Sequence, residues 1–428
     1  RAPVNVPAAP QAAGPVAPRH YAFLVFVTLL NVMNFVDRQL LASFANFIVP
    51  DLGLSNTEFG WLTGFAFILF YSGMGLLAGS LADLVHRPRL VAAGLVLWST
   101  LTAASGAARG FLSLAAPRAL IGVGESVLTP ASLSMLADRF PASRLGFASG
   151  FYYMGVPLGV GASLLVAGYL GPAFGWRNCF YLLGALGLLL SIAMLFVRET
   201  RPAQKLRETH SGDTRSLASN LRALRTALAR SPALSLTICG GVATHFVLGA
   251  AAFDQLWLVG ERGFERAEIA RLSGWVGMAG GVLGNLAGGL GADWWQRRTG
   301  SGRPLFLFWT LLALAPLGFV YRLAPPDSPW FWLGLFSGFV QLGVLYGPTF
   351  ATVQELAPAE IRATVVAFYI LALNFVGLGV GITGGGYLVD ALISRGVAEP
   401  YTWTLLGFGV LSSLSIPFFY AAGRRMSG

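Results

Sequence analysis

The sequence predicts an all-α polytopic membrane protein, with twelve transmembrane helices in two six-helix bundles. Of its 428 residues, 55% are hydrophobic and only 11% are charged, whereas soluble domains carry about 25% charged residues. Glycine is frequent, with 54 residues, as is typical of closely packed transmembrane helices. The chain also contains a long series of apolar runs. This composition excludes an ordinary soluble enzyme, a nucleic-acid-binding protein and a disordered scaffold.

Each predicted span is a mostly apolar stretch of about 20 residues or more, the length that a helix needs to cross the hydrocarbon core. The twelve runs are 21–49, 58–82, 90–108, 112–136, 146–170, 174–197, 232–259, 267–292, 304–323, 329–353, 363–393 and 401–422.

The basic residues predict the orientation of these spans. If the N-terminus is cytoplasmic, twenty of the 29 Lys and Arg residues fall in cytoplasmic segments and seven in outer segments. The remaining two, Arg38 and Arg118, lie inside spans. The positive-inside rule therefore places both termini in the cytoplasm of a multi-pass protein of the cell (inner) membrane. The net charge of +10 is thus explained by topology and requires no nucleic-acid partner.

The longest gap between spans divides them into six and six. We expect five segments: a disordered cytoplasmic tail at 1–19, an N-terminal bundle at 20–198, a cytoplasmic linker at 199–231, a C-terminal bundle at 232–422 and a cytoplasmic tail at 423–428. In the linker, Leu217, Leu221, Leu224 and Leu228 follow helical spacing. This predicts an amphipathic helix that lies either on the inner leaflet or in solvent, and the sequence leaves both open.

A short motif occurs after the second span and again, more loosely, after the eighth. Gly79-Ser-Leu-Ala-Asp83 is followed by Arg87 and Arg89, and Gly289-Leu-Gly-Ala-Asp293 is followed by Arg297. A parallel repeat of this kind is expected of a transporter built from two similar halves.

The first copy of this motif resembles the G-x-L-A-D-x-x-x-R-x-R pattern of the major facilitator superfamily, with His86 in place of the usual glycine. The resemblance covers about residues 20–422 and implies the major facilitator fold. It also implies that the motif joins the two halves at the cytoplasmic side and gates them. The gate residues would be Gly79, Asp83, Arg87 and Arg89, with Asp293 and Arg297 in the second half.

A narrower resemblance is to the Spinster-like transporters. It rests on Asn31-Val-Met-Asn-Phe-Val-Asp-Arg-Gln39 in the first span and Arg118-Ala-Leu-Ile-Gly-Val-Gly-Glu125 in the fourth. The resemblance implies export of sphingolipid or lysolipid substrates, and proton coupling in several members. A chain this rich in arginine need not share that substrate.

Four charged residues lie deep inside predicted spans: Asp37, Arg38, Arg118 and Glu125. Each is costly in hydrocarbon and should face a cavity and find a partner. Asp37 lies about 24 Å from the cytoplasmic start of its helix and Arg118 about 9 Å from the outer start of the fourth, so the two are expected to meet. Glu125 lies about 10 Å further in, near the midplane.

We interpret Asp37 and Glu125 as proton carriers, and Arg118 as the residue that holds an anionic headgroup or locks a carboxylate. The alternative is a permanent structural bridge between Asp37 and Arg118. For Arg38, the sequence leaves open snorkelling or a local partner.

Polar residues on the same spans are further candidates for substrate contact or interhelical hydrogen bonding. They are Asn31, Asn34, Thr129, His245, Gln341, Tyr369 and Asn374. Two acids near outer helix ends, Asp254 and Asp390, are expected to be solvated.

The sequence therefore predicts a non-enzymatic secondary transporter that works by alternating access and is driven by protons. Its substrate is amphipathic or anionic, with a sphingolipid or lysophospholipid first. The alternatives are a transporter of small organic anions or drugs, a receptor, and an uncoupled lipid scramblase. The partners would be membrane lipids, an amphipathic small molecule and protons, with no nucleic acid, cofactor or metal. The chain is expected to be a monomer.

Overall fold

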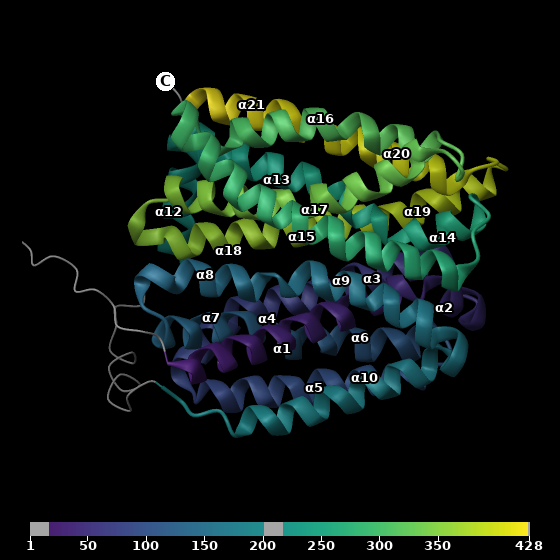
Figure 1. Ribbon diagram of the computed structural model, residues 1–428, viewed down its shortest axis with the longest axis horizontal. Helices are drawn as coiled ribbons and strands as arrows, with labels where there is room; N and C mark the ends of the chain where they lie inside the picture. The colour runs from purple at the N-terminus through teal and green to yellow at the C-terminus, as the bar shows by residue number, and fades with distance from the viewer. Residues whose placement is uncertain (1–16, 201–216, 427–428) are drawn as a thin grey trace, which may run out of the picture.

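A computed structural model describes residues 17–200 and 217–426, which consist of helices and connecting turns. The two described ranges form two helix bundles that lie side by side (Figure 1). We call 17–200 the N-half and 217–426 the C-half. Residues 1–16 of the predicted tail at 1–19, residues 201–216 of the predicted linker and residues 427–428 lie outside the described residues. The expected all-α architecture is confirmed.

The N-half contains six membrane crossings, several of them broken into shorter helices. The first is α1 (Pro18–Ser43), followed by α2 (Ala45–Leu52); the second is α3 (Asn56–Thr63) with α4 (Phe65–Leu84); the third is α5 (Arg87–Gly106). The fourth is α6 (Phe111–Glu125) with α7 (Leu128–Arg139); the fifth is α8 (Ala142–Tyr153), α9 (Gly155–Leu165) and η1 (Val166–Leu170); the sixth is α10 (Gly171–Leu195).

The C-half repeats this plan after the linker helix α12 (Leu217–Arg230). The seventh crossing is α13 (Pro232–Ala250), η3 (Ala251–Phe253) and α14 (Asp254–Gly260); the eighth is α15 (Arg266–Thr299); the ninth is α16 (Arg303–Leu323); the tenth is α17 (Pro329–Leu356). The eleventh is η4 (Ala359–Ile361), α18 (Arg362–Ala372), η5 (Leu373–Gly379) and α19 (Val380–Ser394); the twelfth is α20 (Pro400–Ser413) with α21 (Ser415–Met426).

Nine apolar helical stretches of the described chain are long enough to cross a membrane. One of them, Arg144–Leu195, has 52 residues and turns back at Gly175, whose φ of 74° interrupts the helix. It therefore supplies two crossings. The α3–α4 pair and α15 are not among these nine stretches and supply the other two crossings, which gives the predicted twelve.

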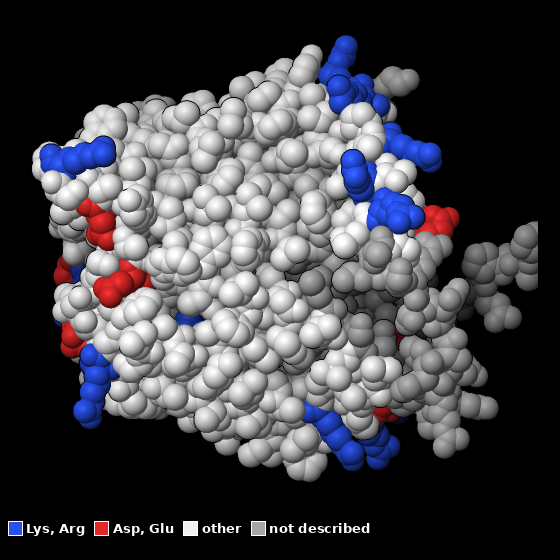
Figure 2. All heavy atoms as spheres, turned by 180° about the vertical axis from the view of Figure 1, so that it is seen from behind, with Lys and Arg blue, Asp and Glu red and all other residues white. Residues whose placement is uncertain are grey.

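The surface agrees with a membrane location. Lys, Arg, Asp and Glu gather at the two ends of the molecule, and an almost uncharged belt lies between them (Figure 2). Large apolar side chains are exposed on this belt, for example Leu189 at 64% and Leu290 at 69%. Lipid is the solvent in which such a surface is stable.

The two ends of the bundles differ in how the halves meet. We call the end with Pro18, α12 and Met426 the terminal end, and the opposite end the distal end (Figure 1). At the distal end, Asn46 Nδ2 donates to Gln255 O at 2.7 Å and Arg271 to Gly168 O at 3.1 Å. At the terminal end, no hydrogen bond joins α8 to α18 among their described side chains. The structure is therefore closed at the distal end.

Two expectations about acids are wrong. Asp254 is not solvated at a helix end, because its carboxylate pairs with the buried Arg322 at 2.8 Å. Asp390 accepts hydrogen bonds from Asn56 and Thr57 of the opposite half. In both cases a neighbouring helix end, far away in sequence, supplies the partner.

The linker helix is present, and it packs onto the C-half. Leu224 and Ala227 are buried in a cluster with Leu234 and Val353, whereas Leu221 is 54% exposed. The side of α12 that carries Leu224 and Ala227 therefore packs against protein, and only the rest of the helix surface, with Leu221, is left to face lipid or solvent.

Candidate functional site

The four embedded charges lie together in the N-half. Arg38 donates from Nη2 and Nε to Oε2 of Glu125, at 3.2 Å and 3.3 Å. The Glu125 side chain is fully buried, whereas that of Arg38 is 22% exposed. The pair therefore joins α1 to α6, and its guanidinium is the partly exposed member.

Arg118 has a different partner from the one predicted. Its Nη2 donates to the main-chain O of Arg38 at 2.6 Å, and its Nη1 to the O of Asp37 at 3.4 Å. Among the described residues, no ion pair joins it to the Asp37 carboxylate. Arg118 therefore fixes the backbone of α1 beside the carboxyl groups, and the Asp37–Arg118 bridge that was the alternative interpretation is absent from the described contacts.

Asp37 is held by a residue that the sequence reasoning missed. Oδ2 of Asp37 lies 2.5 Å from Oγ1 of Thr102 on α5, and both residues are buried. The same hydroxyl lies 2.9 Å from the carbonyl oxygen of Trp98. A lone threonine in an apolar span carries no sequence signal that would identify this role.

Aromatic rings surround the two cations. The Arg38 guanidinium lies 4.8 Å from the ring centroid of Phe35, 5.1 Å from that of Phe67 and 4.3 Å from that of Tyr71. Arg118 lies 4.7 Å from Phe67. Ring faces stabilise desolvated cations by about 2 kcal/mol, which helps to keep both guanidiniums within the membrane. The rings were not predicted, because aromatic residues are frequent throughout the chain.

Several buried polar atoms of this region have no hydrogen-bond partner in the described structure. They are Glu125 Oε1, Arg118 Nε, Asn31 Oδ1 and Asn34 Nδ2. Such atoms cost about 1–3 kcal/mol each when unsatisfied. All four atoms lie on α1 and α6, next to the charged residues.

Two other candidates of the N-half belong to one polar connection. Asn31 Nδ2 donates to the main-chain O of Tyr152 at 2.9 Å, and the Tyr152 hydroxyl lies 3.1 Å from Oγ1 of Thr129. This connection links the first, fourth and fifth crossings beside the charge cluster. Tyr152 itself was not predicted.

In the C-half, His245 has both ring nitrogens engaged. Nδ1 lies 2.7 Å from Gly241 O, which can only accept, so Nδ1 carries the proton. The Tyr346 hydroxyl lies 3.3 Å from Nε2 and donates to it. These contacts give His245 a packing role in this conformation.

The remaining C-half candidates do not join the charge cluster. Tyr369 is fully buried, with its ring 5.0 Å from that of Phe350. Asn374 donates to Ile370 O at 3.0 Å within its own segment. Gln341 is half-buried on α17. The structure brings none of the three into contact with Arg38 or Glu125.

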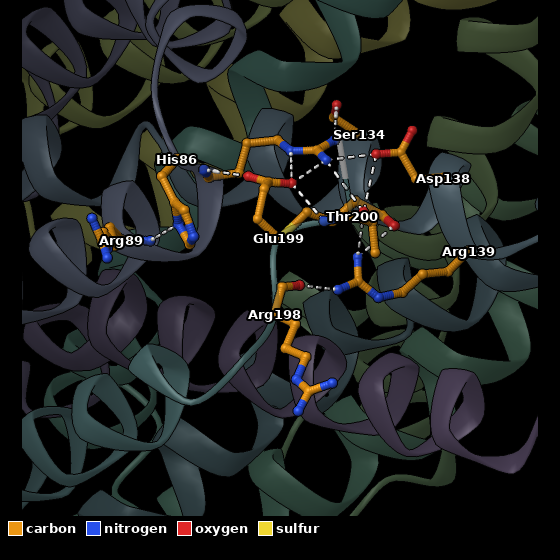
Figure 3. Close-up of polar contacts among 10 residues, drawn as sticks. His86, Arg89, Ser134, Asp138, Arg139, Arg198, Glu199 and Thr200 are labelled. Carbon is orange, nitrogen blue, oxygen red and sulfur yellow. Dashed lines mark hydrogen bonds and ion pairs between the residues drawn. The ribbon is translucent and has the colours of Figure 1, made fainter. Parts of the chain in front are cut away.

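The predicted gate motif builds a second polar site, at the terminal end. Arg87 is fully buried; it donates to Glu199, to Asp138 at 2.5 Å and to Ser134 at 2.9 Å (Figure 3). Its main-chain N–H also donates to Glu199 at 2.8 Å. Arg87 therefore connects the start of the third crossing to the ends of the fourth and sixth crossings.

All these partners of Arg87 belong to the N-half, so the described contacts of Arg87 do not join the two halves in this conformation. Arg89 has an exposed side chain, and its main-chain N–H is capped by His86 (Figure 3). Gly79 and Asp83 lie in α4, and the structure describes only the helical backbone at these two positions.

The aspartate of the second-half copy pairs with the arginine that begins the next helix. Asp293 pairs with Arg303 at 3.0 Å, and Arg303 also pairs with Glu355 at 2.7 Å, while Arg297 is exposed. Arg303 begins the ninth crossing just as Arg87 begins the third. The ion-pair partner of Asp293 therefore lies ten residues further along the chain, and the gate role of Arg297 stays a prediction.

Comparison with known proteins identifies the family. The model of the Major Facilitator Superfamily matches residues 27–382. An MFS-type efflux pump of Mycolicibacterium smegmatis is 31% identical over 87% of this chain and 85% of its own length. The protein spinster of Drosophila melanogaster is 25% identical over 85% of this chain and 60% of its own length.

Solved structures agree with this assignment. A bacterial homolog of the human lysosomal transporter Spinster, in an inward-facing and unoccupied conformation, superimposes with a TM-score of 0.79 at 23% identity, over 95% of this chain and 97% of that one. The fold, the sequence match and the paired halves lead to one conclusion: the chain belongs to the major facilitator superfamily.

Proposed function

We propose that this protein is a proton-coupled secondary transporter of an amphipathic anion, such as a sphingolipid or lysophospholipid, and that it works by alternating access. The observation that carries the proposal is the pair of Arg38 and Glu125. Its carboxylate is fully buried, whereas its guanidinium is 22% exposed. An anion arriving from the open space meets Arg38 first.

Competition for Arg38 supplies the coupling. In the empty site, Glu125 is charged and paired with Arg38. When an anionic headgroup takes over the guanidinium, the buried carboxylate loses its cation, and a proton neutralises it. Oε1 of Glu125, which has no hydrogen-bond partner in the described structure, is the atom that receives this proton. The anion and the proton are therefore bound together.

Asp37 is the second proton carrier in this proposal. The Thr102 hydroxyl has one proton and two acceptors nearby, the Asp37 carboxyl and Trp98 O. Both contacts are satisfied together only when Asp37 carries a proton and donates it to Thr102. Arg118 then acts as a positioning residue, because it holds the backbone of α1 at Asp37 and Arg38.

The distal end is the outer side in this proposal, since the positive-inside rule assigns the terminal end to the cytoplasm. The distal contacts then correspond to a conformation open toward the cytoplasm. Helices that part at one end and close at the other give alternating access to a site near the middle.

The aromatic rings of Phe35, Phe67 and Tyr71 around Arg38 suit a substrate with an apolar part beside its charge. A small organic anion is the second candidate, because a hexuronate transporter of Bacillus subtilis is 26% identical over 86% of this chain and 87% of its own length.

Proteoliposomes with an imposed pH gradient test the proposal. A lysophospholipid and hexuronate are offered separately, and accumulation and proton movement are recorded. Accumulation of the lysophospholipid that follows the gradient supports the first candidate, and accumulation of hexuronate the second. Lipid movement in both directions that ignores the gradient indicates a scramblase and contradicts proton coupling.

The pH dependence of binding gives a sharper prediction. Because one proton is taken up with each anion, the apparent Kd should rise about tenfold for each pH unit above the titration of the coupling carboxyl. Titration calorimetry in two buffers of different ionisation enthalpy measures the proton uptake directly. A Kd that is constant between pH 5 and pH 9 would contradict the exchange of partners at Arg38.

A further inference from the structure

One carboxylate joins the two halves at the distal end. Oδ1 of Asp390, on α19, accepts from the main-chain N–H of Asn56 at 3.2 Å and from its Nδ2 at 2.8 Å. Oδ2 accepts from the N–H and from the hydroxyl of Thr57, both at 2.7 Å. Tyr401 adds a hydrogen bond to Asn56 Oδ1 at 2.6 Å. Asp390 therefore caps the first turn of α3 from the opposite half.

Glycines let the two helices approach below this cap. A Cβ on Gly60 would lie 3.0 Å from Ile382 O, and one on Gly64 would lie 2.7 Å from Thr383 Oγ1. A Cβ on Gly386 would collide with Asn56 O. The contact between α3 and α19 thus combines close backbone packing with a polar cap at its outer end.

The cap differs from the other polar contacts between the halves. Asn46 with Gln255 and Thr383 with Gly60 each contribute one hydrogen bond between neutral groups, and Arg271 contributes one from its guanidinium to Gly168 O. Asp390 accepts four, and a charged acceptor makes each of them stronger than a hydrogen bond between neutral groups. Separation of α3 from α19 breaks all four at once.

We propose that Asp390 is the latch of the outer gate: it holds the halves together at the distal end, and each transport cycle releases it. The inference rests on alternating access as the proposed mode of function. Asp390 is a positioning residue, since it acts on the helices and does not touch the candidate substrate site. Its release exposes the site to the outside, so the latch sets how often the outward-open state is populated.

Spin-label distances across the gate test this directly. In a full-length protein with Cys179 and Cys239 replaced by alanine, labels are placed at Leu112, which is 78% exposed, and at the exposed Ala398. These positions lie at the distal ends of the two halves. The distance distribution is recorded in lipid without substrate and without a pH gradient.

We expect Asp390→Asn to raise the outward-open population at least about tenfold, the factor that corresponds to about 1.4 kcal/mol. The amide keeps one acceptor oxygen, but its NH2 group faces the donors of Thr57. Asp327→Asn is the matched control, because it removes the same charge from an exposed distal loop without touching the opposite half. The control should reproduce the wild-type distribution.

A second variant opens the same gate by another force. Gly386→Val inserts a side chain against Asn56 O and should widen the same distance. If this wedge opens the gate and Asp390→Asn leaves the wild-type distribution, closure depends on packing and the latch proposal is overturned.

A label pair at the terminal end, on Phe196 and Arg298, separates this outcome from failure of alternating access. If neither variant changes the distal or the terminal distances, the halves do not move against each other. That result would reject the proposed mode of function together with the latch.

Discussion

Glu125→Gln is expected to reduce proton-driven accumulation at least about a hundredfold, while exchange of substrate without a gradient continues. Glutamine has nearly the same size as glutamate but cannot release a proton. It also leaves Arg38 without a charged partner, so an anionic substrate no longer competes with a carboxylate. Initial rates of uptake into proteoliposomes, with and without a pH gradient, measure the two activities separately.

The control for this variant is Glu125→Asp, which keeps the carboxyl and shortens the side chain by one methylene. Partial coupling should survive in it. Asp37→Asn tests the second carrier, and we expect it to reduce the driven rate and to spare exchange. Unchanged gradient-driven accumulation in Glu125→Gln would show that the proton travels by another residue and would remove the basis of the coupling proposal.

Arg87→Gln is expected to have the largest effect on stability, about 3 kcal/mol of unfolding free energy. Its guanidinium is buried between Asp138 and Glu199, and removal of one member of a buried ion pair costs about 3–5 kcal/mol. We choose the lower limit because the Asp138 side chain is 36% exposed and regains water. Equilibrium unfolding in a mild detergent, followed by far-UV circular dichroism, measures the change.

Arg89→Gln is the matched control. Arg89 lies two residues from Arg87 and carries the same charge, but its side chain is exposed. Surface substitutions of this kind change stability by about 0.5 kcal/mol or less. If both variants lost the same stability, the network in Figure 3 would not be what stabilises the terminal end of the N-half.

The charge cluster shows where sequence reasoning succeeds and where it stops. Its four members were recognisable because charges in apolar spans are rare. Their pairing was not, because neighbouring helical residues point about 100° apart. Asp37 and Arg38 therefore face different helices, and a modest rotation of α1 decides which of them meets α6. In the structure Arg38 forms the ion pair with Glu125, and Arg118 donates to the main-chain oxygen of Arg38.

The two gate motifs make the same point about repeats. The aspartates at the ends of the second and eighth crossings were aligned by their letters, and Arg297 followed from Arg87 by counting. The cation that pairs with Asp293 is Arg303, at the start of the next helix. The length of α15 determines where α16, and with it Arg303, begins. A five-residue motif contains no information about that length.

The sequence by itself determined the helical membrane fold, the twelve crossings and the residues that carry charge into the membrane. These properties depend on hydrophobicity summed over about 20 neighbouring residues, so small errors at helix ends do not change them. Only the tertiary structure decided the partners of Arg38 and Arg118, the ion pair of Asp254 with Arg322 and the contact of Asp390 with α3. Hydrogen bonds and ion pairs form over about 3 Å, so they depend on the rotation, depth and closeness of helices that lie far apart in the sequence.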